Sequence, residues 1–387
     1  MESHEDRETR MGRTALTIGI VCHFPPPPGG MPGQAEALSR GLAARGVEVV
    51  RIQTNLNGPG LGRAIDSIRV LRSLVRFPVF LFRLARAIPK VSILHVLSCC
   101  GLYFFLFTAP PLVLGRWFGR SVVLNYRGGR AREFFGRWPT FVRWVVRHAD
   151  VIIVPSQFLR EVFAEIGFDA DVIENGCSLD TFAKAAPARL EPTFIVARHL
   201  ESLYNVACVL RAFQLIARRR PDARLLVLGG GTEEARLKAL ALRLGIDSAV
   251  SFLGYVPSAR TPEFYRAASI ALNGSNIDNT PNAILEAFAA GMPVISTKAG
   301  GIPYMIEEGV TGFLVGLDDH QAMAERACWL LENQEAARTM SEHARERARR
   351  HSWDIVLRKW VSLYSDAGPL IDNVPQHAHR PFGARGA

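Results

Sequence analysis

Short apolar runs alternate along this chain with stretches in which apolar and polar residues recur at helical spacing. In the first half, apolar runs rich in β-branched residues predict buried strands at 15–22, 47–52, 93–97, 121–126 and 151–155. The intervening stretches repeat their apolar residues every three or four positions and predict helices at 34–44, 62–90, 139–148 and 156–166. Strands that alternate with helices in this way predict a parallel sheet covered by helices.

A second series of the same kind starts at Thr193. Its predicted strands are 194–197, 224–229, 250–252, 269–273 and 294–297, with helices at 233–244 and 281–290. The alanine- and proline-rich segment 183–192 between the two series is typical of a linker, and a length of 387 residues suits two domains. We therefore predict two Rossmann-like α/β domains, at 15–187 and 193–351, with disordered ends at 1–14 and 367–387.

The stretch 275–303 carries the strongest chemical signal in the second half. Asp278 lies in a polar turn after the strand 269–273, directly before the predicted helix. Thr280 is a suitable N-cap and Pro281 a suitable first helical residue, and Gly291 is the expected helix end.

The start of this helix suits an anion such as a diphosphate, because backbone N–H groups from Asn282 onward and the positive end of the helix dipole meet there. Glu286, inside the same helix, can accept hydrogen bonds from sugar or ribose hydroxyls. The alternative is that Glu286 is only a solvated carboxylate on an amphipathic helix.

The order of these features, ending in Ala-Ala-Gly-Met-Pro-Val at 289–294 and Ala-Gly-Gly-Ile-Pro at 299–303, resembles the donor-site signature of the family 4 retaining glycosyltransferases. That signature has two glutamates separated by seven residues, and here Asp278 stands in place of the first. The resemblance covers roughly 15–365 and implies the GT-B fold: two Rossmann-like domains facing a cleft, and a closing helix at 352–366 that returns to the first domain. It also implies a nucleotide-diphosphate sugar held by the second domain, an acceptor held by the first, and neither a bound metal nor a cofactor.

The resemblance assigns roles on the donor side. Asp278 would contact the transferred sugar and Glu286 the ribose, while Arg198, after the strand 194–197, would hold the diphosphate. Tyr204 falls where the family has a lysine; a phenol can donate a hydrogen bond but supplies no charge. The other residues expected on the donor side are Asn279, Thr280, Asn282, Ala283 and Gly230.

On the acceptor side, Gly29 and Gly30 lie in a turn that could approach a phosphate or sugar closely, or could be only a tight turn. Their turn resembles the loop that opens the family's acceptor domain. Arg127 stands where the family often has a histidine near the reacting sugar; an arginine cannot act as a base there, but it could bind a phosphate or a hydroxyl. His95 is an alternative for that position, or simply a packed residue.

The net charge of +10, from 46 Lys and Arg against 36 Asp and Glu, suggests an anionic partner: a nucleotide, an acidic membrane surface or a nucleic acid. A generally basic proteome would have the same effect. No nucleic-acid-binding module is recognisable, so nucleic acid is not expected. Within 62–90, five arginines lie on one predicted stripe beside Phe77, Phe80 and Phe82 and suit an anionic bilayer, unless this is an ordinary surface helix: Arg69, Arg72, Arg76, Arg83 and Arg86.

Two features predict a cytoplasmic protein. The six cysteines show neither metal-ligand spacing nor a disulfide framework, and the N-terminus lacks the apolar core of a signal peptide. The uncharged stretch 91–115 is long enough to span a bilayer, but its polar residues and prolines predict a strand, a turn and a helix instead.

The sequence therefore predicts a retaining glycosyltransferase whose acceptor is a glycan or a lipid-linked molecule of the cell envelope, working in the cytoplasm and peripherally at the inner membrane face. The alternative suggested by Tyr204 is a non-catalytic GT-B subunit that binds a nucleotide or sugar and assists an active enzyme. A GT-B phosphorylase is less expected, because no lysine lies in a glycine context suited to pyridoxal phosphate.

Overall fold

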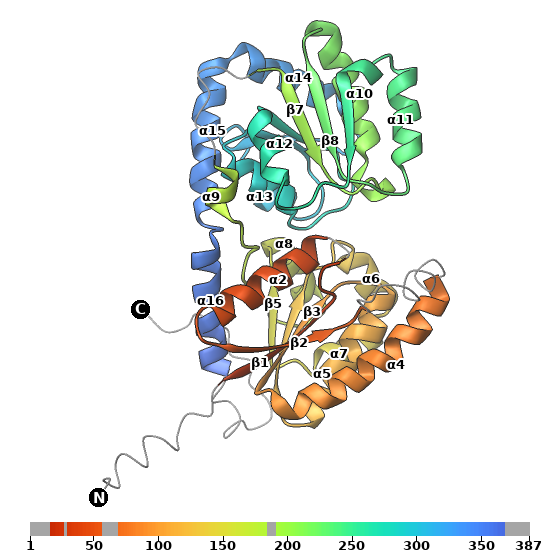
Figure 1. The fold of residues 1–387 in the computed structure, drawn as a ribbon, viewed down its shortest axis with the longest axis vertical. Coiled ribbons are helices and arrows are strands. Elements are labelled where there is room, and N and C mark those ends of the chain that lie inside the picture. Colours follow the sequence, from red (N-terminus) through yellow and green to blue (C-terminus); the bar gives the residue numbers. More distant parts are fainter. Residues whose placement is uncertain (1–15, 27–28, 56–68, 184–190, 368–387) are drawn as a thin grey trace, which may run out of the picture. The chain divides into compact units, whose positions relative to one another are not determined.

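A computed structural model of the chain describes residues 16–26, 29–55, 69–183 and 191–367 (Figure 1). The chain divides into two compact units. The first comprises the chain up to Pro155, Leu159–Ile173 and the residues from Val356 onward, and the second comprises Ser156–Phe158 and Glu174–Ile355. Of the predicted disordered segments, 1–14 and 368–387 lie outside the described residues, whereas Ala367 is the last residue of a helix.

The first unit contains a six-stranded parallel sheet in the order β2-β1-β3-β4-β5-β6. Its strands are β1 Thr17–Cys22, β2 Glu48–Gln53, β3 Ile93–Ser98, β4 Ser121–Tyr126, β5 Val151–Val154 and β6 Asp171–Val172. The α-helices of this part of the chain are α2 Gly30–Ala43, α4 Arg69–Ala87, α5 Ala109–Trp117, α6 Ala131–Arg137, α7 Pro139–Val146, α8 Gln157–Glu165 and, from the far end of the sequence, α16 Trp353–Ala367.

The second unit contains another six-stranded parallel sheet, in the order β12-β11-β10-β7-β8-β9. Its strands are β7 Thr193–Ala197, β8 Arg224–Leu228, β9 Val250–Gly254, β10 Ile270–Asn273, β11 Val294–Thr297 and β12 Gly312–Val315. Its α-helices are α9 Leu179–Phe182, α10 Val206–Arg219, α11 Glu234–Arg243, α12 Thr261–Ala267, α13 Asn282–Ala289, α14 His320–Glu332 and α15 Gln334–Arg349.

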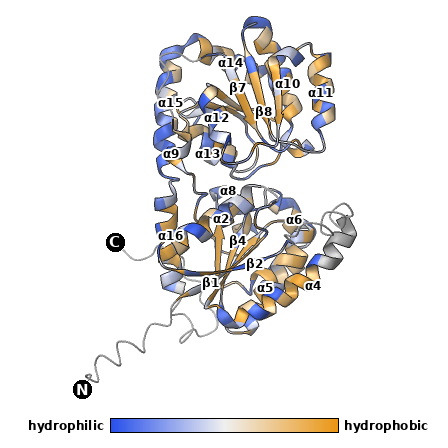
Figure 2. Ribbon diagram, viewed as in Figure 1, coloured by the Kyte–Doolittle hydropathy of each residue, from blue (hydrophilic) through white to orange (hydrophobic). Residues whose placement is uncertain are grey.

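The central strands are apolar because helices cover both faces of each sheet. Every residue of β1, β3, β4, β10 and β11 is buried. Figure 2 shows the strands as largely hydrophobic and the outer helices as mixed. Ligands of such folds bind at the carboxyl ends of the strands, which all meet at one edge of each sheet.

The predicted strands are confirmed within one or two residues, but β6 and β12 were not predicted. The predicted helix 34–44 begins four residues earlier, at Gly30, because Pro32 is tolerated in a first helical turn and the N–H of Gly33 donates to the carbonyl of Gly29 at 3.0 Å. The predicted helix 62–90 is described only from Arg69; 62–68 lies outside the described residues.

The uncharged stretch 91–115 forms the predicted strand, turn and helix. β3 is followed by a π-helical turn at Phe104–Thr108, which continues into α5. Across the described ranges, no helix combines the length and the apolar content needed to cross a bilayer.

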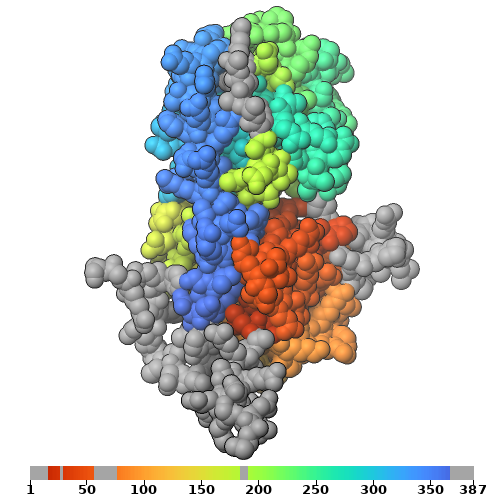
Figure 3. All heavy atoms as spheres, turned by 60° about the vertical axis from the view of Figure 1, so that its left-hand side comes forward, coloured from red at the N-terminus to blue at the C-terminus, as the bar shows by residue number. Residues whose placement is uncertain are grey.

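Helix α16 packs into the first unit from Val356 onward, as the predicted closing helix requires. A Cβ added to Gly41 in α2 would lie 2.4 Å from the Leu357 side chain, so the glycine lets the two helices come close. Figure 3 shows the blue α16 against the red and orange segment that contains α2.

Candidate functional site

Arg198 follows β7 directly, at the carboxyl edge of the second sheet. Its backbone is held against the glycine run that ends β8: its N–H donates to the carbonyl of Leu228 at 2.9 Å. A Cβ on Gly229, whose φ is +127°, would lie 2.0 Å from the carbonyl oxygen of Arg198. Only glycine fits there, and this fixes the point from which the Arg198 side chain starts.

The guanidinium of Arg198 pairs with the carboxylate of Asp278. The two side chains are only 11% and 13% exposed, so water screens the pair less than it would at the surface. The predicted donor-phosphate cation and the predicted sugar-binding acid therefore lie in direct contact.

Asp278 is also held by its own loop. Its Oδ2 accepts a hydrogen bond from the Ser275 hydroxyl at 3.3 Å, and its Oδ1 accepts one from the N–H of Asn279 at 2.9 Å. A Cβ on Gly300 would lie 2.0 Å from the carbonyl oxygen of Asp278. The glycine pair after β11 therefore lets the two backbone segments come close and helps to position Asp278.

Tyr204 lies beside Arg198, as its position in the sequence suggested. The guanidinium carbon of Arg198 is 4.0 Å from the centre of the Tyr204 ring, which is a cation–π contact. Burial raises the pKa of the Tyr204 hydroxyl, against a smaller lowering by Arg198, so the phenol stays neutral. The contact between Tyr204 and Arg198 is therefore made through the face of the aromatic ring.

One donor of Arg198 is left over: among the described residues, its buried Nε has no hydrogen-bond partner. A cavity of about 10 Å³ beside it has room for about one water molecule and is too small for a nucleotide. The cavity is lined by Ile195, Ala197, Arg198, Tyr265, Ala271, Leu272, Asn273, Ala283, Ile284 and Val294.

Helix α13 begins one residue later than predicted. Pro281 is the N-cap, with ψ at 121°, and Thr280 precedes it, because the extended ψ of the proline keeps it out of the helix. The predicted end at Gly291 is confirmed: its φ is +68°, and the N–H of Met292 donates to the carbonyl of Ala287 at 2.9 Å, as in a Schellman motif.

Glu286 lies on α13, partly buried. Burial raises the pKa of its carboxyl, while a hydrogen bond with Tyr265 and the charge of Arg198 lower it in part. The Tyr265 hydroxyl lies 3.3 Å from the carbonyl of Ala283, so Tyr265 of α12 contacts both Ala283 and Glu286 of α13. Glu286 is therefore within electrostatic range of Arg198, as a common donor site requires.

Most of the remaining donor-side residues are held by hydrogen bonds from other segments of the second unit. Asn279 is buried, and its Oδ1 accepts a hydrogen bond from the Ser156 hydroxyl. The Asn175 amide donates to the carbonyl of Thr280 at 3.0 Å and to Oδ1 of Asn282 at 2.8 Å. These contacts make Asn279, Thr280 and Asn282 part of the frame that positions the start of α13.

Gly230 lies in the same region, beyond the end of β8. Its carbonyl accepts a hydrogen bond from the N–H of Leu200 at 3.0 Å, and it is partly exposed. Ser275, Tyr265 and Asn175 were not predicted as site residues. Their partners lie 3 to 107 positions away in sequence, and only Ser275, three residues before Asp278, left a local signal.

The residues predicted on the acceptor side belong to the first unit. Gly29 and Gly30 form the start of α2, where Gly29 has extended backbone angles that any residue adopts. Gly30 is exposed and Gly29 is partly so. A fourteen-residue helix thus begins directly at the predicted turn.

Arg127 and His95 belong to one buried hydrogen-bonded chain. Arg127 donates to Oδ1 of Asn125 at 3.3 Å, Nδ2 of Asn125 lies 3.0 Å from Nε2 of His95, and Nδ1 of His95 lies 2.6 Å from the Tyr364 hydroxyl. This arrangement assigns Nε2 of His95 as the acceptor and Nδ1 as the protonated nitrogen. The Trp360 ring stacks on His95 with 4.6 Å between ring centres.

His95 is therefore a packed residue. It is fully buried, both ring nitrogens have partners, and burial with the charge of Arg127 lowers its pKa to about 3. The prediction that His95 faces an acceptor is wrong, because no face of the ring is available. Arg127 itself is partly exposed, and burial lowers its pKa to about 10, so it remains a cation.

The structure thus brings Arg198, Tyr204, Asp278 and Glu286 together in the second unit, at the carboxyl ends of β7 and β10 and on α13. An arginine fork over an aromatic ring, next to a helix start and two carboxylates, can bind a phosphorylated ligand that also carries hydroxyl groups. Arg127, Gly29 and Gly30 form no part of this cluster; they belong to the first unit.

Two family models match the chain. The one described as "Glycosyltransferase Family 4" matches residues 28–181, and the one described as "Glycosyl transferases group 1" matches residues 180–347. They meet near the boundary between the two units and together cover most of the chain.

Among curated relatives, the chain is 30% identical over 265 residues to the D-inositol 3-phosphate glycosyltransferase of Corynebacterium urealyticum, a match over 62% of each chain. It therefore spans about three fifths of that relative. It is 26% identical over 356 residues to the N-acetyl-alpha-D-glucosaminyl L-malate synthase of Bacillus anthracis, covering 86% of this chain and 91% of the relative.

Solved structures share the fold. The sucrose-phosphate synthase of Thermosynechococcus elongatus superposes with a TM-score of 0.72 at 19% identity, over 91% of this chain and 98% of that one. HepE of Anabaena, solved in complex with UDP, superposes with a TM-score of 0.68 at 18% identity, over 91% and 100% of the two chains.

Proposed function

The chain belongs to the group 1 glycosyltransferases of family 4, and from this premise we propose that it transfers a sugar from a nucleotide-diphosphate sugar to an acceptor hydroxyl with retention of anomeric configuration. Its two parallel six-stranded sheets, with these neighbours, confirm the predicted GT-B fold. The observation that carries the proposal is the cluster of Arg198, Asp278 and Glu286 beside the start of α13.

In the proposed reaction the bond between the anomeric carbon and the diphosphate oxygen breaks, the acceptor oxygen bonds to that carbon and passes its proton to an oxygen of the departing diphosphate, and the protonated nucleoside diphosphate leaves. The charge that develops on the diphosphate is the main barrier, and positioned donors lower it. Arg198 would supply its guanidinium, including Nε, and the first turn of α13 would supply N–H groups and the positive end of its dipole.

The two carboxylates would take the sugar groups of the donor. Asp278, held by Ser275 and the N–H of Asn279, would bind hydroxyls of the transferred sugar. Glu286, beside Tyr265, would bind the ribose. Tyr204 would hold the Arg198 guanidinium in place. The proposal includes no metal ion or cofactor, since Arg198 and the helix start supply the positive charge.

The nucleotide is proposed to be uridine diphosphate as a first choice, because Anabaena HepE was solved with UDP and with UDP-glucose. The acceptor is proposed to be a glycan or a lipid-linked molecule of cell-envelope glycan synthesis, bound by the first unit near Gly29, Gly30 and Arg127. An enzyme with a lipid-linked acceptor would work in the cytoplasm, at the inner face of the cell membrane.

The test compares Glu286→Ala and Glu286→Gln with Glu263→Ala, which changes an exposed glutamate of α12. Loss of a charged acceptor removes about 1.5–3 kcal/mol of interaction, so kcat/KM for the donor should fall about 10- to 150-fold in Glu286→Ala. Glu263→Ala should match the unchanged protein, and circular dichroism should show that all variants fold.

The donor itself is found with a panel of nucleotide sugars in thermal-shift measurements, since a ligand that binds the folded state raises its apparent stability. A Glu286→Ala protein with unchanged donor affinity and rate would show that the donor site is elsewhere. A protein that binds a nucleotide sugar but neither hydrolyses nor transfers it would favour the non-catalytic subunit.

A further inference from the structure

Three helices of the first unit form one layer on one face of its sheet. α4 connects β2 to β3, α5 connects β3 to β4, and α7 precedes β5, and with the order β2-β1-β3-β4-β5 all three crossovers move in the same direction across the sheet. Right-handed crossovers then place all three helices on the same face. Figure 1 shows α4, α5 and α7 side by side.

Direct contacts join this layer. Phe80 of α4 packs edge-on against Phe107, with 5.2 Å between ring centres, and Phe105 packs against Phe141 of α7 at 5.0 Å. Arg116 at the end of α5 donates to Asp150, which follows α7, at 2.5 Å. The buried sides of α5 and α7 carry Leu112 and Gly115, and Val142, Val145 and Val146, so their opposite sides form the outer surface of this layer.

Large aromatic side chains lie exposed on that surface. Trp117 is 80% exposed, Phe82 62%, Phe118 54% and Trp144 43%. Aromatic side chains are normally buried where the fold allows, and contiguous exposed apolar surface marks interaction sites.

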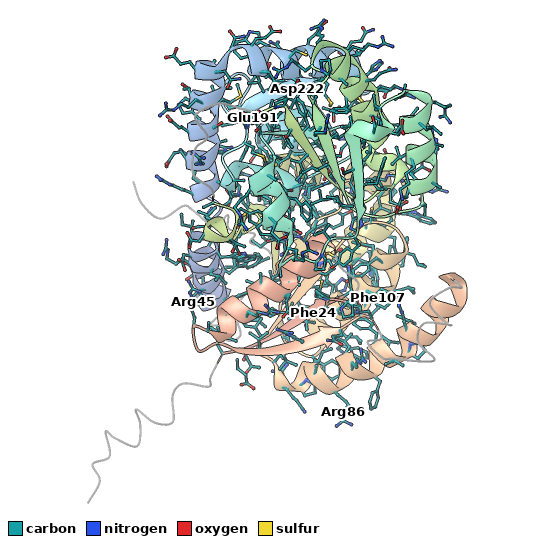
Figure 4. All side chains as sticks on the ribbon, turned by 45° about the horizontal axis from the view of Figure 1, so that its top comes forward. Phe24, Arg45, Arg86, Phe107, Glu191 and Asp222 are labelled. Carbon is teal, nitrogen blue, oxygen red and sulfur yellow. The ribbon has the colours of Figure 1, made fainter. Side chains whose placement is uncertain are left out.

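The charge around these aromatics is predominantly positive. Residues 91–150 contain eight arginines and two acids, Glu133 and Asp150, and Asp150 is paired with Arg116. Among exposed arginines of the layer, Arg86 lies on α4, Arg143 on α7 and Arg147 directly after α7. Figure 4 shows Arg86 projecting away from its helix.

The predicted arginine stripe on α4 is not a single exposed face. Nη1 of Arg83 donates to the carbonyls of Gln53 and Asn55, at 3.2 and 2.8 Å, and so caps the end of β2. Arg76 lies close enough to His23 for its charge to lower the pKa of that histidine. The side chains of Arg69 and Arg72 lie outside the described residues. Of the stripe arginines whose side chains are described, only Arg86 is exposed. It belongs to the same helix layer as α5 and α7.

We propose that this docking face, formed by Phe82, Arg86, Arg116, Trp117, Phe118, Arg143, Trp144 and Arg147, binds the surface of a bilayer that contains anionic lipid. Tryptophan favours the level of the lipid headgroups because its ring is apolar and its N–H is polar. Arginines beside it are attracted by the negative surface potential. Tryptophan, phenylalanine and arginine are also enriched in protein interfaces, so a protein partner is the occupant left if the vesicle test fails.

The inference rests on the proposed function for its purpose, since a lipid-linked acceptor would have to be met at a membrane, but its test needs no catalysis. The full chain is sedimented with vesicles of phosphatidylcholine alone and with vesicles containing phosphatidylglycerol, at low and high salt. Binding should require phosphatidylglycerol and should weaken as salt rises.

Two groups of variants locate the surface. Arg86→Gln, Arg143→Gln and Arg147→Gln combined should weaken binding about 100-fold, at about fivefold for each cation. The matched control changes three exposed arginines of the second unit, Arg218, Arg243 and Arg350, to Gln, and should bind as the unchanged protein does.

Trp117→Ser with Phe118→Ser should weaken binding on the order of tenfold, even at high salt, because the loss is of apolar contact. Its control is Leu242→Ser with Tyr255→Ser, at positions 66% and 56% exposed in the second unit. The donor thermal shift should be unchanged in every variant, which shows that the proteins are folded.

A chain that stays in the supernatant with phosphatidylglycerol at low salt would overturn the proposal, as would equal binding to neutral vesicles. Binding that the docking-face variants leave unchanged would overturn the choice of surface. None of these results would affect sugar transfer to a soluble acceptor, so failure of this inference and failure of the proposed function can be told apart.

Discussion

The two units have similar sheets but organise the cation at the carboxyl edge of each sheet in different ways. In the first, Arg127 follows β4 and begins a hydrogen-bonded chain through Asn125 and His95 to Tyr364. In the second, Arg198 follows β7 and pairs with the acid Asp278. The first arrangement consists of neutral groups beyond the arginine, whereas the second is a pair of opposite charges.

This difference indicates the role to which the carboxyl edge of each sheet is suited. The uncharged chain of the first unit joins two strands and α16, and each of its members is satisfied by the next, so it favours rigidity. The pair in the second unit can exchange a partner, because a diphosphate can replace a carboxylate as the anion beside an arginine. Similar positions in similar folds thus hold an arginine joined to a neutral buried chain in one unit, and in the other an ion-paired arginine that the proposed function assigns to the diphosphate.

The largest effect is expected from removing the exchangeable cation. Arg198→Ala should lower turnover by about 10²- to 10³-fold, the usual result of removing a donor that stabilises a developing negative charge. Arg198→Lys should recover only part of it, since lysine keeps the charge but not the planar fork. Steady-state kinetics with the identified donor measure this, and a loss below tenfold would mean that Arg198 does not hold the diphosphate.

The next effect tests the neutral chain. Folding lowers the pKa of His95 to about 3 from the ordinary value of 6.5, so the folded state excludes a proton that the unfolded chain binds. The stabilisation is present above pH 6.5 and is lost as the pH falls toward 3, by about 1.4 kcal/mol per pH unit.

Urea unfolding of the first unit between pH 7 and 4 measures this slope, which should be shallower in His95→Gln. His343→Gln, at an exposed position of α15, should keep the full slope. Equal slopes in the unchanged protein and His95→Gln would contradict the buried neutral histidine.

A smaller effect tests how Tyr204 supports the pair. Tyr204→Leu should lower kcat/KM about 5- to 30-fold, the equivalent of a partly desolvated cation–π contact of about 1–2 kcal/mol. Tyr204→Phe keeps the ring and should stay within about twofold. If Tyr204→Phe were as impaired as Tyr204→Leu, the hydroxyl would be the important group, as the position of the family's lysine first suggested.

The smallest effect is expected at Ser275, which donates to Asp278 at 3.3 Å. Ser275→Ala removes a hydroxyl whose single hydrogen is shared between Asp278 and Oδ1 of Asn273, 2.9 Å away; this is about 0.5–1.5 kcal/mol of hydrogen bonding and should lower kcat/KM two- to tenfold. Ser251→Ala, on an exposed position of β9, is the matched control. A Ser275→Ala enzyme as active as the control would show that the ion pair alone orients Asp278.

The sequence predicted the fold closely where its signals are local. The strands are short apolar runs between turn residues, and Gly291 ends α13 as a glycine with positive φ should. The strand β12 was not predicted, because its four residues lie close to a run of polar turn residues. The predicted start of α2 was four residues too late, because Pro32 and the glycines around it are typical of a turn.

The candidate cluster was predicted from two local patterns, the motif 275–303 and the end of the strand 194–197. Arg198, Asp278 and Glu286 each stand at a fixed place after a strand or within a helix, so the pattern was enough to bring them together. The supporting residues Tyr265 and Asn175 could not be found in this way, because they act across the fold on α13. Tyr204 was placed correctly, but sequence could not show that it meets Arg198 through its ring face.

Helix α16 has a consequence for synthesis on the ribosome. The hydrogen-bonded chain of the first unit ends at Tyr364, and the 182 residues Glu174–Ile355 are translated between that unit's last strand and the segment of α16 that completes it. Domains generally fold as units during synthesis. The second unit can therefore fold while the first is still incomplete. The first must leave the surroundings of His95 in β3 and of Gly41 in α2 uncovered until residues 356–367 have been translated, and chaperones have their best opportunity to bind it before then.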